Sequence, residues 1–148
     1  HALAKELGAT VVEDPNAIYD VDADIFTPCA LGAIINPETI DRLKVKVVAG
    51  AANNQLETRE MGAELQKRGI FYAPDYVINA GGIINVMGEL DARFDAKWVE
   101  GKLVTLKATL GEIMDTAARE ARPANIVADE LARQRLADAA EQKALAAE

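Results

Sequence analysis

The sequence has 148 residues, of which half are hydrophobic and 27% are charged, and its net charge is −8. This length suits one domain with a sizeable core, and the acidic balance argues against nucleic acid as a partner. No apolar run approaches the roughly 20 residues of a membrane helix, and the first residues do not resemble a signal peptide. The single cysteine, Cys29, cannot form an internal disulfide, which favours a reducing interior, so we expect a cytoplasmic protein without a membrane partner.

Short elements are predicted in the first part of the chain. Ala2–Leu7 should end a helix, because Gly8 follows it and glycine is common just beyond a helix C-terminus. A short strand is predicted over residues 10–12, a helical turn over residues 16–19, and a buried strand over residues 24–27.

The middle of the chain alternates in the same way. Asn36 and Pro37 form a helix-start signal, since asparagine caps a helix and proline suits its first turn, so a short helix is predicted over residues 37–43. The elements expected next are a strand over residues 45–49, an amphipathic helix over 57–68, a strand over 70–72 and a loop over 76–82.

Strands that alternate with helices indicate an α/β fold, in which right-handed crossovers join parallel strands and helices cover both faces. From Gly82 onward only helices are predicted: one over residues 83–93, a second, and a third from about Asn125. We therefore divide the chain into residues 1–90, which carry the sheet, and residues 91–148, a C-terminal helical segment. The second of these helices has one apolar face, formed by Leu103, Leu106, Leu110, Ile113 and Ala117.

Three apolar segments break at small residues or amides, as buried parallel strands do where their carboxyl ends open onto a ligand site. They contain the strings PCALGA (28–33), GAANNQL (50–56) and YAPDYVINAGG (72–82). These strings resemble the glutamate/leucine/phenylalanine/valine dehydrogenase family, above all its leucine-type members. The resemblance implies that residues 1–90 are the C-terminal part of a dinucleotide-binding domain, a partial Rossmann-like, doubly wound parallel sheet.

The resemblance also shows which family segments this sequence does not contain. Members of the family carry an N-terminal domain with catalytic lysines and an aspartate, and a G-x-G-x-x-G turn with a later acidic residue for the dinucleotide. Neither is found in the 148 residues. We therefore interpret the chain as the C-terminal part of a longer enzyme, and we assign no catalytic residue and no metal ligands within it.

Asn53 is the candidate site residue with two roles. The small residues Gly50, Ala51 and Ala52 would let a flat ring approach the backbone, and the Asn53 amide offers both a donor and an acceptor. On the residues alone an ordinary turn through Asn53 and its neighbour is favoured, since asparagine tolerates a left-handed backbone. The resemblance implies instead that Asn53 contacts both the cofactor, NAD, and the substrate carboxylate, with Ala51 and Ala52 lining the cofactor.

The segment around Cys29 is a second candidate. The resemblance implies that the backbone at Ala30 and Leu31 lies against the nicotinamide and ribose side of the cofactor. Cys29 itself is predicted to be a small buried side chain, because the sequence contains no histidine other than His1 to activate it as a nucleophile.

Residues 79–82 are predicted to lead into a helix, whose free amides would favour an anionic group. Ile83 and Val86 lie three positions apart and thus on one helix face, an arrangement more typical of a core than of a pocket. The resemblance implies that both line the hole for the substrate side chain. Asp75 lies in a proline-containing turn, and no catalytic role is assigned to it because the family's catalytic aspartate belongs to the N-terminal domain.

The function that the resemblance implies is NAD-dependent oxidative deamination of a branched-chain L-amino acid by a homo-oligomer. We favour leucine and related branched-chain amino acids over phenylalanine or glutamate as the substrate, and glutamate in particular would need a cation that the apolar string GGIINV does not contain. The alternative is a non-catalytic α/β remnant or interaction module, since a sheet without its first strand, turn and helix would leave an unpaired edge. An in-register upstream reading frame that encodes the glycine-rich turn would favour the enzyme, and a stop codon just before His1 would favour the remnant.

Overall fold

Three short parallel strands form the sheet at the centre of the fold. The computed structural model describes residues 1–90 and 96–146. Within them consecutive strands pair in parallel, in the order β1-β2-β3, and each lies inside a strand predicted from the sequence. The strands are β1 (Ile25–Phe26), β2 (Val47–Val48) and β3 (Phe71–Tyr72). The predicted α/β fold with a parallel sheet is therefore confirmed, although the strands are shorter than expected.

One face of the sheet is buried under the segments that connect the strands. Phe26 pairs with Val48 and Val48 with Tyr72, so these three side chains form one row on this face. The row packs against two connecting elements, η2 (Ile40–Arg42) and α2 (Met61–Lys67). The buried residues of this first core are Ile35, Ile40, Val48, Leu65, Ile70 and Tyr72. Their removal from water stabilises the sheet on this side.

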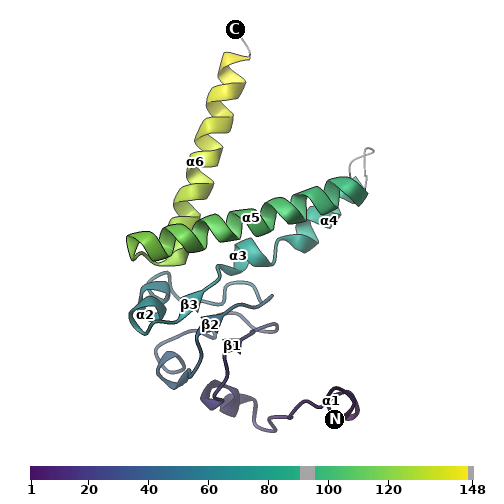
Figure 1. Ribbon diagram of the computed structural model, residues 1–148, viewed down its shortest axis with the longest axis vertical. Coiled ribbons are helices and arrows are strands. Elements are labelled where there is room, and N and C mark those ends of the chain that lie inside the picture. The colour runs from purple at the N-terminus through teal and green to yellow at the C-terminus, as the bar shows by residue number, and fades with distance from the viewer. Residues whose placement is uncertain (91–95, 147–148) are drawn as a thin grey trace.

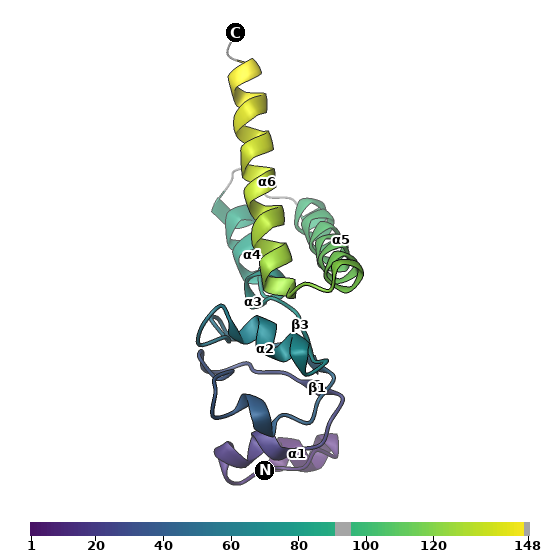
Figure 2. The ribbon, with the colours of Figure 1, turned by 90° about the vertical axis from the view of Figure 1, so that its left-hand side faces the viewer.

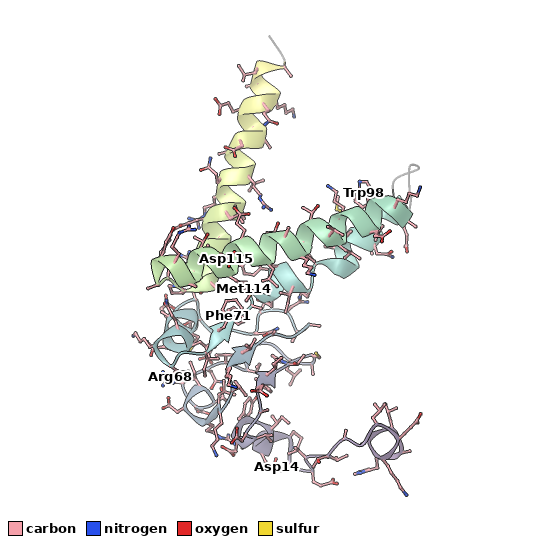
Figure 3. The ribbon with its side chains drawn as sticks, viewed as in Figure 1. Asp14, Arg68, Phe71, Trp98, Met114 and Asp115 are labelled. Carbon is pink, nitrogen blue, oxygen red and sulfur yellow. The ribbon has the colours of Figure 1, made fainter. Side chains whose placement is uncertain are left out.

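The opposite face is covered at β3 and open at β1. Phe71 packs there against a second core, and Figure 3 shows it below α5 (Ala96–Glu120), near Met114. Ile25, at the other end of the same row, is 56% exposed. Helices thus lie on both faces of the sheet at β3, while β1 keeps one face open to solvent. The buried residues of the second core are Ile113, Ala117, Ala124, Val127 and Ala128.

The C-terminal part of the structure is helical, as predicted. α4 (Gly81–Leu90) lies beside α5, and α6 (Ala124–Leu145) starts near the C-terminal end of α5 and then rises away from the sheet (Figure 1, Figure 2). Of the predicted apolar face of α5, Ile113 and Ala117 are buried, whereas Leu103 is half exposed because α5 extends beyond the sheet. No helix of the described residues is long and apolar enough to span a membrane.

The N-terminal helix lies apart from the sheet. α1 (Ala2–Leu7) ends at Gly8 in a left-handed conformation, with φ of 66°, which confirms the predicted glycine cap. No residue of α1 is buried, and Figure 1 places it beyond the edge strand β1. The predicted turn at residues 16–19 is confirmed as η1 (Pro15–Asp20), and Arg42 ties η1 to η2 through Asp20.

Two elements predicted in the first half of the chain are wrong. Residues 10–12 are not a strand: β1 forms the edge of the sheet among the described residues, and a segment without a ladder partner gains no strand hydrogen bonds. Residues 37–43 contain only η2 instead of an α-helix. The predicted Asn36 cap is present, since its Oδ1 accepts from Thr39 N, but the chain becomes extended at Leu43, which packs against the first core, so only a short helical turn fits before β2.

The loop predicted over residues 76–82 is also wrong, because a short helix, α3 (Asp75–Ile78), forms there and α4 starts soon after it. Pro74 precedes α3, and its carbonyl accepts from the backbone N–H groups of Val77 and Ile78. A proline at the start of a helix loses no intrahelical hydrogen bond, so proline is compatible with a helix start as well as with a turn. Pro74 was therefore read as a turn residue although it precedes a helix.

The remaining differences concern element boundaries. α2 begins four residues later than the helix predicted over 57–68, and α4 begins two residues earlier than the helix predicted over 83–93. Residues 91–93 of that prediction lie outside the described residues. The division of the chain into 1–90 and 91–148 stays a prediction.

Candidate functional site

The carboxyl ends of the three strands meet at one edge of the sheet, because the strands are parallel. We call residues 27–33, 49–55 and 73–79, which follow β1, β2 and β3, the strand-end segments. The first two are joined directly, since Ala52 N donates to the carbonyl oxygen of Pro28 at 2.9 Å. This edge therefore gathers the three sequence strings from which the resemblance was drawn.

Two glycines allow the strand-end segments to approach each other closely. A Cβ atom at Gly50 would lie 2.1 Å from the carbonyl oxygen of Pro28. A Cβ atom at Gly32 would lie 2.8 Å from the carbonyl oxygen of Asn53 and 3.0 Å from that of Asn54. Both positions therefore need glycine, because the neighbouring backbone leaves no room for a side chain.

The segment after β2 is held from inside by Gln55. The Gln55 side chain is fully buried, and its Nε2 donates to the carbonyl oxygens of Gly50 at 2.7 Å and of Ala52 at 3.0 Å. Asn54 has φ of 53°, the left-handed backbone that asparagine tolerates, which confirms the predicted turn at this residue. Asn53, just before it, is exposed at the sheet edge.

Asp75 fastens this turn to the segment after β3. The carboxylate is 6% exposed, and its Oδ2 accepts from Asn54 N at 2.5 Å. Its Oδ1 accepts from the Tyr72 hydroxyl at 2.7 Å. Burial raises the pKa of Tyr72, and the hydrogen bond to Asp75 raises this pKa further, so the hydroxyl keeps the proton that it donates.

Asn79, the residue after α3, makes a second link. Its Nδ2 donates to Asn53 Oδ1 at 2.6 Å and to the carbonyl oxygen of Ala51 at 3.4 Å. With its oxygen engaged in this way, the Asn53 amide has its Nδ2 donor without a hydrogen-bond partner among the described residues. An exposed, oriented amide donor at the carboxyl edge of a parallel sheet can bind a carbonyl or carboxylate oxygen.

The structure brings most of the predicted cofactor residues to this edge. Ala30, Leu31 and Ala51 are exposed near Asn53, with Leu31 at 74%. Ala52 is buried as a whole residue, because its N–H donates to the carbonyl oxygen of Pro28 and its own carbonyl oxygen accepts from Gln55 Nε2. These cofactor contacts stay predictions.

The prediction for Cys29 is wrong, because this side chain is exposed. Pro28 is the buried residue at this point, and residues 29–33 run along the exposed surface of the sheet edge. Cys29 therefore lies on the solvent side of the segment.

The two predicted substrate-pocket residues lie on α4. Ile83 is 59% exposed and Val86 45% exposed, so neither belongs to a packed core in the described structure. The sequence pattern alone favoured the core, and exposure at this level is consistent with the pocket role that the resemblance implies. That role stays a prediction.

Sequence reasoning missed two residues that organise the site, Asp75 and Asn79. Asp75 was set aside as a turn residue, and Asn79 was treated only as part of a helix entry. The position of both residues shortly after β3 could have predicted this role, since polar side chains that follow one strand can reach the segment after the neighbouring strand. Among the described residues, no group of His, Cys, Asp and Glu side chains could hold a metal ion.

The fold is that of an α/β protein with a parallel sheet, and the carboxyl edge of this sheet is its candidate ligand site. Residues 2–144 match the sequence profile of the Glutamate/Leucine/Phenylalanine/Valine dehydrogenase family. The chain belongs to this family.

Similar proteins act on different amino acids according to their names. The chain is 49% identical over 132 residues to a leucine dehydrogenase of Thermoactinomyces intermedius, covering 89% of this chain and 36% of that protein. It is 60% identical over 83 residues to a phenylalanine dehydrogenase of Bacillus thermotolerans, covering 56% of this chain and 22% of that protein. The crystal structure of L-tryptophan dehydrogenase from Nostoc punctiforme matches with a TM-score of 0.87 at 42% identity, covering 95% of this chain and 41% of that one. The chain spans less than half the length of each relative.

Proposed function

We propose that this chain is the C-terminal part of an NAD-dependent amino-acid dehydrogenase and forms the nicotinamide-facing side of its active site. Such an enzyme converts an L-amino acid, water and NAD⁺ reversibly to a 2-oxo acid, ammonium, NADH and a proton. The chemistry that NAD⁺ would supply when bound is the acceptance of the α-hydrogen of the amino acid as a hydride. In this proposal the lysine and aspartate that activate water and move protons belong to the part of the relatives that this chain does not span.

The observation that carries the proposal is the orientation of Asn53. Its amide is exposed at the carboxyl edge of the sheet, and Asn79 holds its oxygen, so that the Nδ2 donor is available to a ligand. A carboxamide oxygen of nicotinamide or a substrate carboxylate is a suitable acceptor for this donor. If Asn53 bound both the nicotinamide carboxamide and the substrate carboxylate, it would align the α-carbon of the substrate with the nicotinamide ring. Such alignment is how a positioning residue increases the reaction rate.

The other residues at the edge suit the nicotinamide end of NAD. Ala30, Leu31 and Ala51 are exposed small or aliphatic residues in the strand-end segments after β1 and β2. An apolar wall with one oriented polar group matches a flat ring that carries a carboxamide. Gly32 and Gly50 have no room for a side chain, so the segments that would line the ring keep their close spacing. Ala52, which is buried, would lie beneath the lining of this site and support it. NAD, in preference to NADP, is inferred from the resemblance to leucine-type members.

Side-chain selection is assigned to Ile83 and Val86. Both are exposed, aliphatic and β-branched, and both lie on α4, which begins shortly after Asn79. An apolar wall of this kind favours a branched aliphatic substrate, and we propose leucine as the preferred amino acid. The named relatives include enzymes for leucine, phenylalanine and tryptophan, which are all apolar amino acids.

The complete enzyme is proposed to be a cytoplasmic homo-oligomer whose substrate is a small molecule, an amino acid or a 2-oxo acid. This part of the proposal rests on the family resemblance and the single cysteine. The net charge of −8 supports the absence of nucleic acid among its partners.

The test is substitution of Asn53 in the complete enzyme, followed by steady-state kinetics with leucine and NAD. Asn53→Ala should lower kcat/KM by about 10-fold to 1,000-fold, which corresponds to the loss of about 1.5–4 kcal/mol of hydrogen bonding and alignment. Asn54→Gly is the matched control, because glycine keeps the left-handed backbone of this residue and removes only the neighbouring amide. Equal losses from the two substitutions would show that Asn53 is not the contact.

A further inference from the structure

Asp75 is a buried carboxylate to which the proposed reaction gives no role. It is 6% exposed and lies in the first turn of α3, directly below the turn that carries Asn53. A buried carboxylate is costly unless hydrogen bonds compensate for the lost water. Both oxygens of Asp75 have such a partner, Asn54 N for Oδ2 and the Tyr72 hydroxyl for Oδ1.

The partner on Oδ2 is part of the site. The backbone N–H of Asn54 belongs to the peptide that follows Asn53, and Asn54 is in the left-handed conformation. Isolated left-handed residues cost energy and persist where their surroundings hold them. The Asp75 carboxylate, in the neighbouring strand-end segment, stabilises this conformation by accepting the hydrogen bond from Asn54 N.

The partner on Oδ1 fixes the carboxylate itself. Tyr72 ends β3 and is buried in the first core, so its hydroxyl has a defined position in the sheet. The backbone N–H of Asp75 donates in turn to this hydroxyl at 3.2 Å. A chain of contacts therefore runs from the sheet through Tyr72 and Asp75 to the peptide after Asn53.

The same short helix holds Asn53 at a second point. Asn79 N donates to the carbonyl oxygen of Asp75 at 2.9 Å, and the Asn79 side chain donates to Asn53 Oδ1. α3 and its C-terminal residue thus fix both the backbone and the amide of the 53–54 segment. A loss of either contact leaves the amide free to rotate away from a ligand.

We propose that Asp75 is a positioning residue for the dehydrogenase site, which acts by clamping the Asn53–Asn54 turn through the Asn54 N–H. This inference rests on the proposed function of Asn53. The carboxylate does not touch a ligand and does not exchange protons with it. Its effect on the reaction passes through the orientation of Asn53.

The kinetic test uses the complete enzyme with Asp75→Ala, Asp75→Asn and, as a matched control, Asp115→Ala, which removes an exposed carboxylate on α5 (Figure 3). Misplacing a contact group by about 1 Å costs up to about 100-fold in rate, so Asp75→Ala should lower kcat/KM about 10-fold to 100-fold. Asp75→Asn should recover most of this loss, because its oxygen can still accept from Asn54 N while its amide donates to the Tyr72 oxygen. Asp115→Ala should retain the activity of the unmodified enzyme.

A double substitution separates positioning from a general structural effect. If Asp75 acts through Asn53, Asp75→Ala should cause little further loss of kcat/KM in an enzyme that already carries Asn53→Ala. Additive losses would overturn the inference, since they would show that Asp75 acts independently of Asn53. If Asn53→Ala alone has no effect, the proposed function is wrong, and the role of Asp75 in catalysis is wrong with it.

Hydrogen exchange tests the clamp itself without reference to activity. In Asp75→Ala, the peptide that contains residues 51–56 should exchange its amide hydrogens faster, while a peptide from α2 should be unchanged. Tyr72→Phe serves as a second variant if Asp75→Ala does not fold, because it removes the hydroxyl that holds Oδ1 and should also speed exchange at residues 51–56. Unchanged exchange at residues 51–56 would overturn the clamp.

Discussion

The contact between Gly62 and Asn125 should control how α6 docks on the sheet-bearing part of the chain. A Cβ atom at Gly62 would lie 2.1 Å from Asn125 Oδ1 and 2.6 Å from its Cγ. Asn125 is 4% exposed and donates from Nδ2 to the carbonyl oxygen of Arg59, so its side chain cannot swing into solvent without losing this hydrogen bond. Gly62→Ala therefore forces a buried group to move.

The expected magnitude combines three terms. Overpacking at a buried contact costs about 1–3 kcal/mol. The lost hydrogen bond between Asn125 and Arg59 adds about 1 kcal/mol. Alanine in place of glycine stabilises a helix by about 1 kcal/mol, which offsets part of this cost. Gly62→Ala should therefore lower the free energy of unfolding by about 1–3 kcal/mol.

Urea unfolding of the 148-residue chain, followed by circular dichroism, measures this change as a shift in midpoint at constant slope. Gly101→Ala is the matched control, because a Cβ atom there meets nothing within 4 Å and the substitution should stabilise α5 by about 0.5–1 kcal/mol. The two glycine substitutions should thus shift the midpoint in opposite directions. A Gly62→Ala protein as stable as Gly101→Ala would refute the packing of Asn125 against α2.

Val86→Ala in the complete enzyme should lower the ratio of leucine to phenylalanine kcat/KM by about 10-fold to 200-fold, the range for small changes in an apolar pocket. Because Val86 is 45% exposed, the melting temperature of the Val86→Ala enzyme should hardly change. A lowered melting temperature with an unchanged ratio would instead assign Val86 to packing. The isolated 148-residue chain should show no dehydrogenase activity with 4-methyl-2-oxopentanoate, ammonium and NADH, measured by NADH absorbance. A turnover above about 1 per second, an ordinary enzymatic rate, would show that the chain contains the catalytic groups itself.

The site illustrates why single residues were easier to predict than their partners. Asn53 was proposed as a site residue because it lies in a string that resembles the family and follows a strand directly. Its partner Asn79 lies 26 residues away, and Asp75 lies 21 residues from Asn54. Contacts between residues so far apart leave no repeating pattern in the sequence. Asp75 was therefore interpreted as an ordinary turn residue and Asn79 as part of a helix entry.

Local signals therefore determined the order of the three strands, the helical character of the C-terminal part, the glycine end of α1 and the three strings that follow the strands. These features depend on propensities and burial patterns within a few neighbouring residues. Only the tertiary structure decided that residues 10–12 have no strand partner, that Cys29 is exposed and that Asp75 is buried against Asn54. Each of these depends on which distant segment occupies the adjacent space, and that is settled when the parallel strands align and their carboxyl ends come together.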